Sequence, residues 1–292
     1  MTNGRSTYEY EKSLKSSVSD ELINVYVLRP IAGVIVRLLY NTRVTPNQVT
    51  VASTMAGLAA AAFYLQGDGR TTAIAGLLVT LKDLLDSADG QLARTKGQYT
   101  RIGRFLDSIG DFVVDAAVFG AIGWVLYASS ENLWMVGLSC LGFAGITLRV
   151  SYHVFYQTSF LHLEEKYRFN RVTEEVKEED RRGDRPALEL QRVFQTIYGW
   201  QDRLMVRIDA WCRGGRGDEQ FLIRWYSDGA GLRVSGFLGM GTELFLLTLC
   251  SVFNRLELYL YLNLILMNGI VILSLFYRSR ILNHKLQRGV VK

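Results

Sequence analysis

The sequence is poor in the residues that form most soluble catalytic centres and metal sites. It has only three cysteines and three histidines among 292 residues. The cysteines are isolated and lack the spacing of a zinc site or a disulfide framework, so we interpret them as small apolar residues. The histidines are scattered and none lies near a recognisable nucleophile motif, which argues against a serine or cysteine hydrolase. These residues are Cys140, Cys212, Cys250, His153, His162 and His284.

Other absences narrow the class of protein further. The first twenty residues are polar and charged, and no small-residue cleavage site follows the first apolar run, so we expect no cleavable signal peptide. The net charge of +5 comes without a nucleic-acid motif, and it therefore indicates contact with anionic lipid headgroups. The stretch Gly214–Gly217 lacks the Lys-Ser/Thr ending of a phosphate-binding loop and is interpreted as a linker.

By contrast, the sequence is rich in long hydrophobic runs. A transmembrane helix needs about 20 mostly apolar residues, and six segments satisfy this length. Several of them are hydrophobic on every side, whereas a helix exposed to water would show an apolar stripe. We therefore predict an all-α, polytopic membrane protein with six transmembrane helices. The spans are expected at roughly 47–66, 71–90, 103–128, 132–158, 231–253 and 256–277.

The distribution of basic residues predicts the orientation of these spans. Three loops are very short and hold only Arg70 and Arg255, whereas both termini, the 94–104 turn and the segment after residue 160 hold most of the other basic residues. The positive-inside rule therefore places the latter regions, and the active site with them, in the cytoplasm. The expected parts are a cytoplasmic or interfacial segment 1–45, spans one to four in 46–159, a cytoplasmic insertion 160–228, and spans five and six with a basic tail in 229–292.

Two segments outside the spans have the apolar periodicity of amphipathic helices. Residues 21–42 favour a helix at the membrane interface, or one packed on the bundle, although Pro30 argues against a smooth buried helix. In the insertion, a second stripe with Trp200 and Trp211 leaves three roles open: resting on the membrane, covering the site or packing on a partner subunit. The stripes are Ile23, Val27, Ile31, Ile35 and Leu38, and Leu190, Phe194, Ile197, Leu204, Ile208 and Trp211.

Two of the expected spans carry paired aspartates at their facing ends. Asp86 and Asp89 end the second span, and Asp107 and Asp111 open the third. Spacings of three and four place each pair on one helical face, and the short turn brings the pairs to one depth. Carboxylates in apolar surroundings need a cation. We therefore predict a phosphate-handling site with two divalent ions about 3.5–4 Å apart, Mg²⁺ or alternatively Mn²⁺ or Ca²⁺.

Small and basic residues accompany the aspartates. Gly90 and Gly103 let backbone or a flat ring approach closely. Arg94 is suited to meet phosphate oxygens. Arg101 and Arg104 lie nearby, but they are better explained as ordinary charges on the cytoplasmic side.

This segment resembles the signature of the CDP-alcohol phosphotransferase family. It matches all eight fixed positions, and Thr45–Thr50 resembles the motif before that family's first span. The resemblance implies a membrane enzyme of phospholipid synthesis that cleaves the pyrophosphate of a CDP-alcohol, releases CMP and joins the phospho-alcohol to an acceptor hydroxyl. The signature here is Asp86-x2-Asp89-Gly90-x2-Ala93-Arg94-x8-Gly103-x3-Asp107-x3-Asp111.

The resemblance also implies roles for particular residues. The four aspartates would bind metal, and Asp111 would also act as the base. Members of the family are typically homodimers, and the pair Ala116 and Gly120 permits close helix packing either between or within chains. Nucleotide or diphosphate contacts are implied for Asn47, Thr50, Gly90, Arg94, Thr100 and Gly103.

The sequence leaves the substrates open. The donor is either CDP-diacylglycerol with a polar acceptor such as inositol phosphate, or a soluble CDP-alcohol with a lipid acceptor. Phe112 follows the last aspartate where many phosphatidyl-transferring members have a basic residue, which weakens the first alternative. Arg149 and Arg233 are acceptor-binding candidates, with snorkelling to the interface as the alternative for each. The roles of Asp83 and Asp115 are equally open.

A different class of protein is a divalent-cation transporter that uses the aspartates as an ion path. The carboxylates cluster at one expected membrane face and do not run across the bilayer, which argues against this class.

Overall fold

The computed structural model describes Tyr10, Glu21 and residues 23–164, 173–181 and 184–289. Every regular element among these residues is helical, which confirms the all-α prediction. Expectations for the other positions of the N-terminal segment, the insertion and the basic tail lie outside the described residues. The described chain forms two compact units, the first mainly of residues 23–143 and 244–259 and the second of residues in 144–243 and 260–289.

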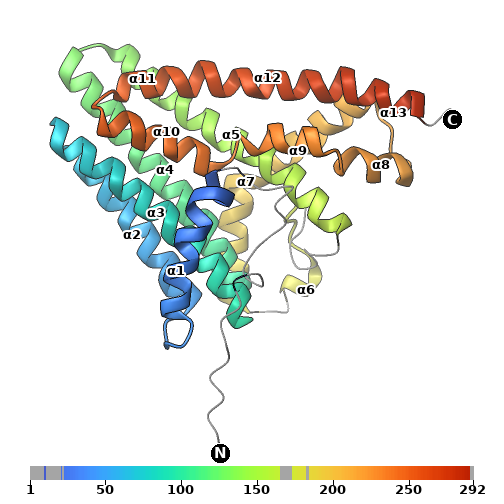
Figure 1. Ribbon diagram of the computed structural model, residues 1–292, viewed down its shortest axis with the longest axis horizontal. Coiled ribbons are helices and arrows are strands. Elements are labelled where there is room, and N and C mark those ends of the chain that lie inside the picture. Colours follow the sequence, from blue (N-terminus) through green and yellow to red (C-terminus); the bar gives the residue numbers. More distant parts are fainter. Residues whose placement is uncertain (1–9, 11–20, 22, 165–172, 182–183, 290–292) are drawn as a thin grey trace, which may run out of the picture. The chain divides into compact units, whose positions relative to one another are not determined.

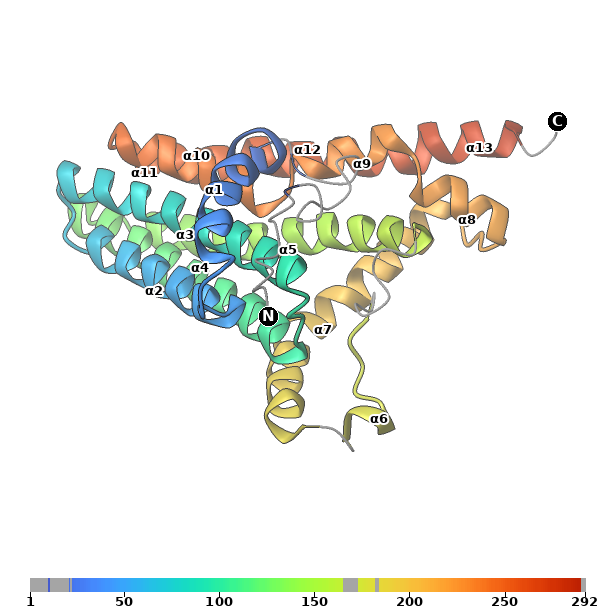
Figure 2. The same ribbon diagram turned by 60° about the horizontal axis from the view of Figure 1, so that its bottom comes forward.

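Four helices form most of the first unit: α1 (Arg29–Leu39), α2 (Pro46–Tyr64), α3 (Gly69–Lys96) and α4 (Arg101–Ser130). Helices α2 and α3 pack tightly, α2 also packs on α4, and α1 packs on α3. Helices α2, α3 and α4 lie side by side in Figures 1 and 2. A Cβ added to Gly57 would lie 2.4 Å from Val114 Cγ1, so the missing side chain lets two helices approach closely.

Side-chain caps determine where α2, α3 and α4 begin. Thr45 and Gln48 form a capping box, in which Thr45 Oγ1 accepts from the Gln48 N–H at 3.3 Å and Gln48 Oε1 accepts from the Thr45 N–H at 2.9 Å. Asp68 caps α3. Thr100 Oγ1 accepts from the Gly103 N–H at 2.9 Å and caps α4. The register of α2, α3 and α4 is therefore set at their first residues.

Helix α1 follows a π-helical turn at Asn24–Leu28. Pro30 lies in its first turn, directly after the π-helical turn, and the chain stays helical on both sides of it. The helix packs on α3 through buried residues that include Ala32 and Val36. Ile31 and Leu38, from the apolar stripe found in the sequence, are 49% and 71% exposed. The helix thus has one face on the bundle and a second, exposed apolar face.

The second unit contains the remainder of α5 and the helices of the insertion. Its core joins aromatic side chains such as Tyr152 and Phe155 to Met205 and Leu232. After α7, its C-cap Gly214 and the following Gly215 have positive φ. The helices are α5 (Leu133–Leu163), α6 (Glu178–Arg181), α7 (Arg185–Arg213), α8 (Glu219–Tyr226) and α9 (Gly229–Gly236).

The chain ends in α10 (Met240–Val252) and a long run of helix. That run comprises α11 (Leu256–Tyr261), a π-helical segment (Leu262–Met267), α12 (Asn268–Phe276), a second π-helical segment (Tyr277–Leu282) and α13 (Asn283–Gly289).

Four helices among the described residues are long and apolar enough to cross a membrane. They match the third to sixth spans expected from the sequence. The first two expected spans are also helices, α2 and α3, but they are less apolar because α2 begins with Pro46-Asn47-Gln48 and α3 carries several charged residues. The four are Arg101–Ser130, Leu133–Leu163, Gly229–Val252 and Leu256–Leu286.

Candidate functional site

Three aspartates converge between the facing ends of α3 and α4. One carboxylate oxygen from each of Asp86, Asp89 and Asp107 lies within 4.8 Å of the others. Asp89 is buried and the other two are half-buried. The helical spacing and the short 97–100 turn therefore bring together the three residues that the sequence pattern placed side by side.

Helix α2 is tied to this cluster by a threonine. The Thr50 hydroxyl donates a hydrogen bond to Asp89 Oδ2, and both side chains are buried. This bond orients the Asp89 carboxylate, which keeps lone pairs available for a cation. Thr50, a nucleotide-contact candidate in the sequence, thus contacts the aspartate cluster itself.

The cluster has the chemistry of a divalent-cation site. Asp107 Oδ1 is buried and accepts no hydrogen bond from the described residues. A buried carboxylate oxygen without a donor is costly, and a divalent cation supplies the missing partner. Three converging carboxylates are hard oxygen ligands of the kind that Mg²⁺ takes, so the residues present fit the expected metal.

The fourth aspartate of the signature has a different partner. Asp111 Oδ1 forms a salt bridge with Lys82 Nζ, and the side chain of Lys82 is only 2% exposed. Asp111 is not among the three aspartates whose oxygens converge. The sequence analysis missed Lys82, although a lysine within an expected span is itself a signal of a functional site or a paired charge.

The six nucleotide-contact candidates belong to α2, α3 and the start of α4. A Cβ on Gly103 would lie 2.4 Å from Asn47 Oδ1, so the glycine admits the asparagine side chain. Gly90 lies under the Arg94 guanidinium, whose Nη1 would be 3.4 Å from an added Cβ. Thr100 is the N-cap of α4 and is exposed.

The two acceptor candidates lie in the second unit and differ from each other. Arg149 is 2% exposed, so it does not snorkel. Its Nη2 lies 3.1 Å from Glu243 Oε2, and its Nη1 donates to Asn268 Oδ1 at 2.8 Å. Asn263 Nδ2 also donates to Glu243. Arg233, in α9, is exposed.

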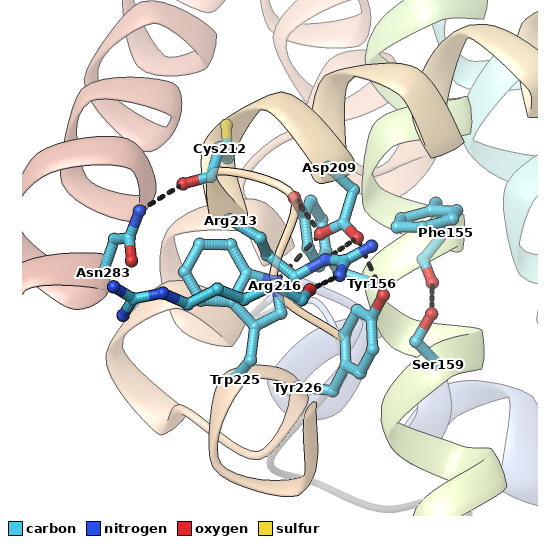
Figure 3. Close-up of polar contacts among 10 residues, drawn as sticks. All are labelled: Phe155, Tyr156, Ser159, Asp209, Cys212, Arg213, Arg216, Trp225, Tyr226 and Asn283. Carbon is cyan, nitrogen blue, oxygen red and sulfur yellow. Dashed lines mark hydrogen bonds and ion pairs between the residues drawn. The ribbon is translucent and has the colours of Figure 1, made fainter. Parts of the chain in front are cut away.

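A second buried carboxylate that the sequence analysis missed is Asp209 in α7. It accepts hydrogen bonds from Tyr156 Oη of α5 at 3.1 Å and from Trp225 Nε1 and Tyr226 Oη of α8 at 2.8 Å each. Arg213 Nε lies 2.8 Å from Asp209 Oδ2, which also accepts from Tyr226, whereas Tyr156 and Trp225 donate to Oδ1. Figure 3 shows these side chains pointing toward Asp209. The i,i+4 spacing of Asp209 and Arg213 was the available sequence signal.

The amphipathic stripe of α7 is only partly buried. Trp200 and Trp211 are 49% and 70% exposed, whereas Met205 and Cys212 are buried. Burial raises the pKa of the Cys212 thiol to about 11, which keeps it protonated and unreactive at neutral pH. The three cysteines are free; Cys212 and Cys250 are buried, whereas Cys140 is exposed.

Known proteins resemble the part of the chain that carries the aspartates. Residues 43–161 match the family model described as CDP-alcohol phosphatidyltransferase. The chain is 35% identical over 118 residues to the phosphatidylinositol phosphate synthase of Corynebacterium glutamicum, covering 39% of this chain and 51% of that protein. It is 35% identical over 104 residues to the archaetidylinositol phosphate synthase of Pyrococcus horikoshii, covering 35% and 53%.

A third relative has a different acceptor in its name. The CDP-diacylglycerol–serine O-phosphatidyltransferase of Mycobacterium bovis is 35% identical over 97 residues, which cover 33% of this chain and 32% of that protein. The chain thus spans about half the length, or less, of these curated relatives.

Proposed function

We propose that this chain, which belongs to the CDP-alcohol phosphatidyltransferase family through residues 43–161, transfers a phospho-alcohol from a CDP-alcohol to an acceptor hydroxyl and releases CMP. The observation that carries the proposal lies inside the matched segment. Asp86, Asp89 and Asp107 converge, and a buried oxygen of Asp107 has no donor among the described residues. Such a site is suited to a cation that offsets the charge of a pyrophosphate.

In the proposed reaction, Asp86, Asp89 and Asp107 hold the divalent ion. When bound, the ion stabilises the negative charge that develops on the pyrophosphate oxygens. Asp111 accepts the proton of the acceptor hydroxyl, whose oxygen forms a bond to the phosphorus that carries the alcohol. The bond between that phosphorus and the bridging oxygen breaks, and CMP leaves with this oxygen.

The nucleotide end of the donor is proposed to lie against the residues at the helix ends around the cluster. Arg94 provides a guanidinium for phosphate oxygens, and Gly90 and Gly103 leave room for the side chains of Arg94 and Asn47 beside them. Thr50 acts through Asp89, because its hydroxyl already donates to that carboxylate. The remaining proposed contacts are Asn47 and Thr100.

We propose CDP-diacylglycerol as donor and a polar, phosphate-bearing alcohol such as inositol phosphate as acceptor. The names of the relatives support this direction, since one names CDP-diacylglycerol and two name inositol phosphate lipids as products. The acceptor residues Arg149 and Arg233 remain proposals, and the buried Arg149–Glu243 pair gives Arg149 a structural alternative.

The chain is an integral membrane protein, and we propose that α2 and α3 bring the number of spans to six. The active site then faces the cytoplasm, an orientation that the basic loops favour. The exposed face of α1 would lie at the interface. The proposed homodimer is supported by Ala116 and Gly120, which are exposed on α4, and its test is the mass of the detergent-solubilised protein.

The test of function is CMP release by the purified chain in detergent. A panel that pairs CDP-diacylglycerol or soluble CDP-alcohols with polar or lipid acceptors is incubated with Mg²⁺ or with EDTA. We expect CMP only with Mg²⁺ and a complete pair, and most with CDP-diacylglycerol and inositol phosphate. Release with a soluble CDP-alcohol and a lipid acceptor instead would reverse the direction, and no release with any pair would favour the transporter.

A further inference from the structure

The side chain of Lys82 is held inside the first unit from both ends. Its ammonium contacts Asp111, and the whole residue is 1% exposed. Ser53 Oγ donates to the Lys82 carbonyl at 2.8 Å, and a Cβ on Gly57 would lie 3.2 Å from Lys82 Cγ. The stem of the lysine is therefore packed against α2, and its ammonium is directed at Asp111 in α4.

The ammonium lies in the negative field of the aspartate cluster. Besides Asp111, the carboxylates of Asp86, Asp83 and Asp115 act favourably on its charge. Asp83 and Asp115 are themselves buried, and the Lys82 ammonium offsets part of the cost of burying their charge. A buried ammonium is costly without such partners, so a cation that displaced Lys82 from Asp111 would leave a lysine poorly compensated.

We propose that the Lys82 ammonium takes the position of a second cation in the aspartate site. The chain then holds a single divalent ion, at Asp86, Asp89 and Asp107, and Asp111 stays outside its coordination as a carboxylate that Lys82 positions. This inference rests on the proposed function and replaces the two ions expected from the sequence. It follows from one difference among the four aspartates: Asp86, Asp89 and Asp107 converge, whereas Asp111 is paired with the buried Lys82.

The number of bound ions tests the proposal directly. The full chain in detergent is titrated with Mn²⁺ alone, and bound and free metal are separated by equilibrium dialysis and examined by electron paramagnetic resonance. We expect one ion per chain with the spectrum of an isolated Mn²⁺. Lys82→Met, which keeps the length of the side chain without its charge, is expected to bind two ions with a spin-coupled spectrum. Two ions in the wild type, or one in Lys82→Met, would overturn the proposal.

A charge-neutral variant covers the case in which Lys82→Met does not fold. Lys82→Met/Asp111→Asn removes both charges of the pair and leaves no unpaired charge behind. We expect one Mn²⁺ per chain, with an affinity within about threefold of the wild type. A loss of tenfold or more would make Asp111 a ligand and contradict the inference.

A matched control is available on the same helix. Lys96 donates to the carbonyls of Thr42 and Val44, away from Asp111, so Lys96→Met should bind one ion as the wild type does. Metal stoichiometry and CMP release are separate measurements. Absence of CMP with one bound ion would count against the proposed function, whereas CMP release with two bound ions would count only against the role of Lys82.

Discussion

Each of the two units of this chain holds an aspartate with a buried carboxylate oxygen, but the two aspartates have opposite surroundings. Asp209 accepts four hydrogen bonds or ion-pair contacts, so both of its oxygens are satisfied by the protein. Asp107 has a buried oxygen with no donor from the described residues. The Asp209 carboxylate, whose oxygens have protein donors, joins helices to one another. The Asp107 carboxylate, which has an oxygen without a donor, is suited to bind a cation from outside the protein.

The largest expected effect comes from Asp107→Asn. Replacing a metal-binding carboxylate by an amide should lower Mn²⁺ affinity and CMP release at least about 100-fold. Stability without metal should not fall, because the substitution removes an unsatisfied charge. Dialysis, the CMP assay and thermal unfolding with EDTA measure the three quantities. Wild-type metal affinity in this variant would show that Asp107 is not a ligand.

The opposite pattern is expected for Asp209→Ala. Loss of the carboxylate leaves Tyr156, Trp225 and Arg213 without their acceptor, and breaking a buried pair typically costs about 3–5 kcal/mol of unfolding free energy. Thermal unfolding in detergent should show a clear fall in Tm. Mn²⁺ stoichiometry of the folded fraction should be unchanged, and a stability equal to the wild type would remove the distinction between the two aspartates.

The Arg149–Glu243 pair sharpens the comparison, because a buried ion pair can either stabilise the fold or position Arg149 to bind the acceptor. If the pair is structural, Arg149→Ala should cost about 3 kcal/mol, and Arg149→Met/Glu243→Gln should recover most of it, since no unpaired charge remains. The acceptor KM of the double variant separates the alternatives. An unchanged KM assigns the pair to stability, and a KM raised tenfold or more assigns Arg149 to the acceptor.

The smallest effect is expected at Asp202 of α7. Burial and the neighbouring Glu174 raise the pKa of Asp202 from 3.8 to about 6. Between about pH 4 and 6 the folded state therefore keeps Asp202 protonated while the unfolded chain releases the proton. The contribution of Asp202 to the free energy of unfolding is greatest below about pH 4 and is lost as the pH rises to about 6. Asp202→Asn should be more stable than the wild type at pH 8, by about 1 kcal/mol, and equal to it near pH 3.5.

A pH series of thermal unfolding checks this expectation. Glu189→Gln is the control, since Glu189 pairs with Arg192 on the surface of the same helix and both are more than half exposed. That variant should differ little from the wild type at any pH. A variant Asp202→Asn that is less stable at pH 8 would contradict the assigned cause of the shift.

The convergence of Asp86, Asp89 and Asp107 could be predicted because it depends on local rules. Helical spacing and a turn of a few residues are enough to bring the three together. The Lys82–Asp111 and Arg149–Glu243 pairs join residues 29 and 94 positions apart, and they depend on which helix faces meet. Periodicity does not specify that rotation, so the sequence identified the charged residues of the site more completely than their partners.

The number of spans illustrates the same limit. Length alone identified α2 and α3 as helices. The polar start of α2 and the charged residues of α3 make both less apolar than the four helices that are apolar enough to cross a membrane. The insertion was recognised as amphipathic, yet Asp209 was overlooked because its partners Tyr156 and Trp225 come from separate helices.

The contacts of Asp209 also bear on how this protein can be engineered. The insertion is fastened to α5 through Tyr156, and its last turn in α7 is fastened to α13, where Asn283 Nδ2 donates to the Cys212 carbonyl at 2.9 Å. Deleting the insertion to obtain a minimal catalytic core would leave Tyr156 and Asn283 without these hydrogen-bond partners. A design that transfers the insertion to another protein should therefore transfer Tyr156 and Asn283 as well.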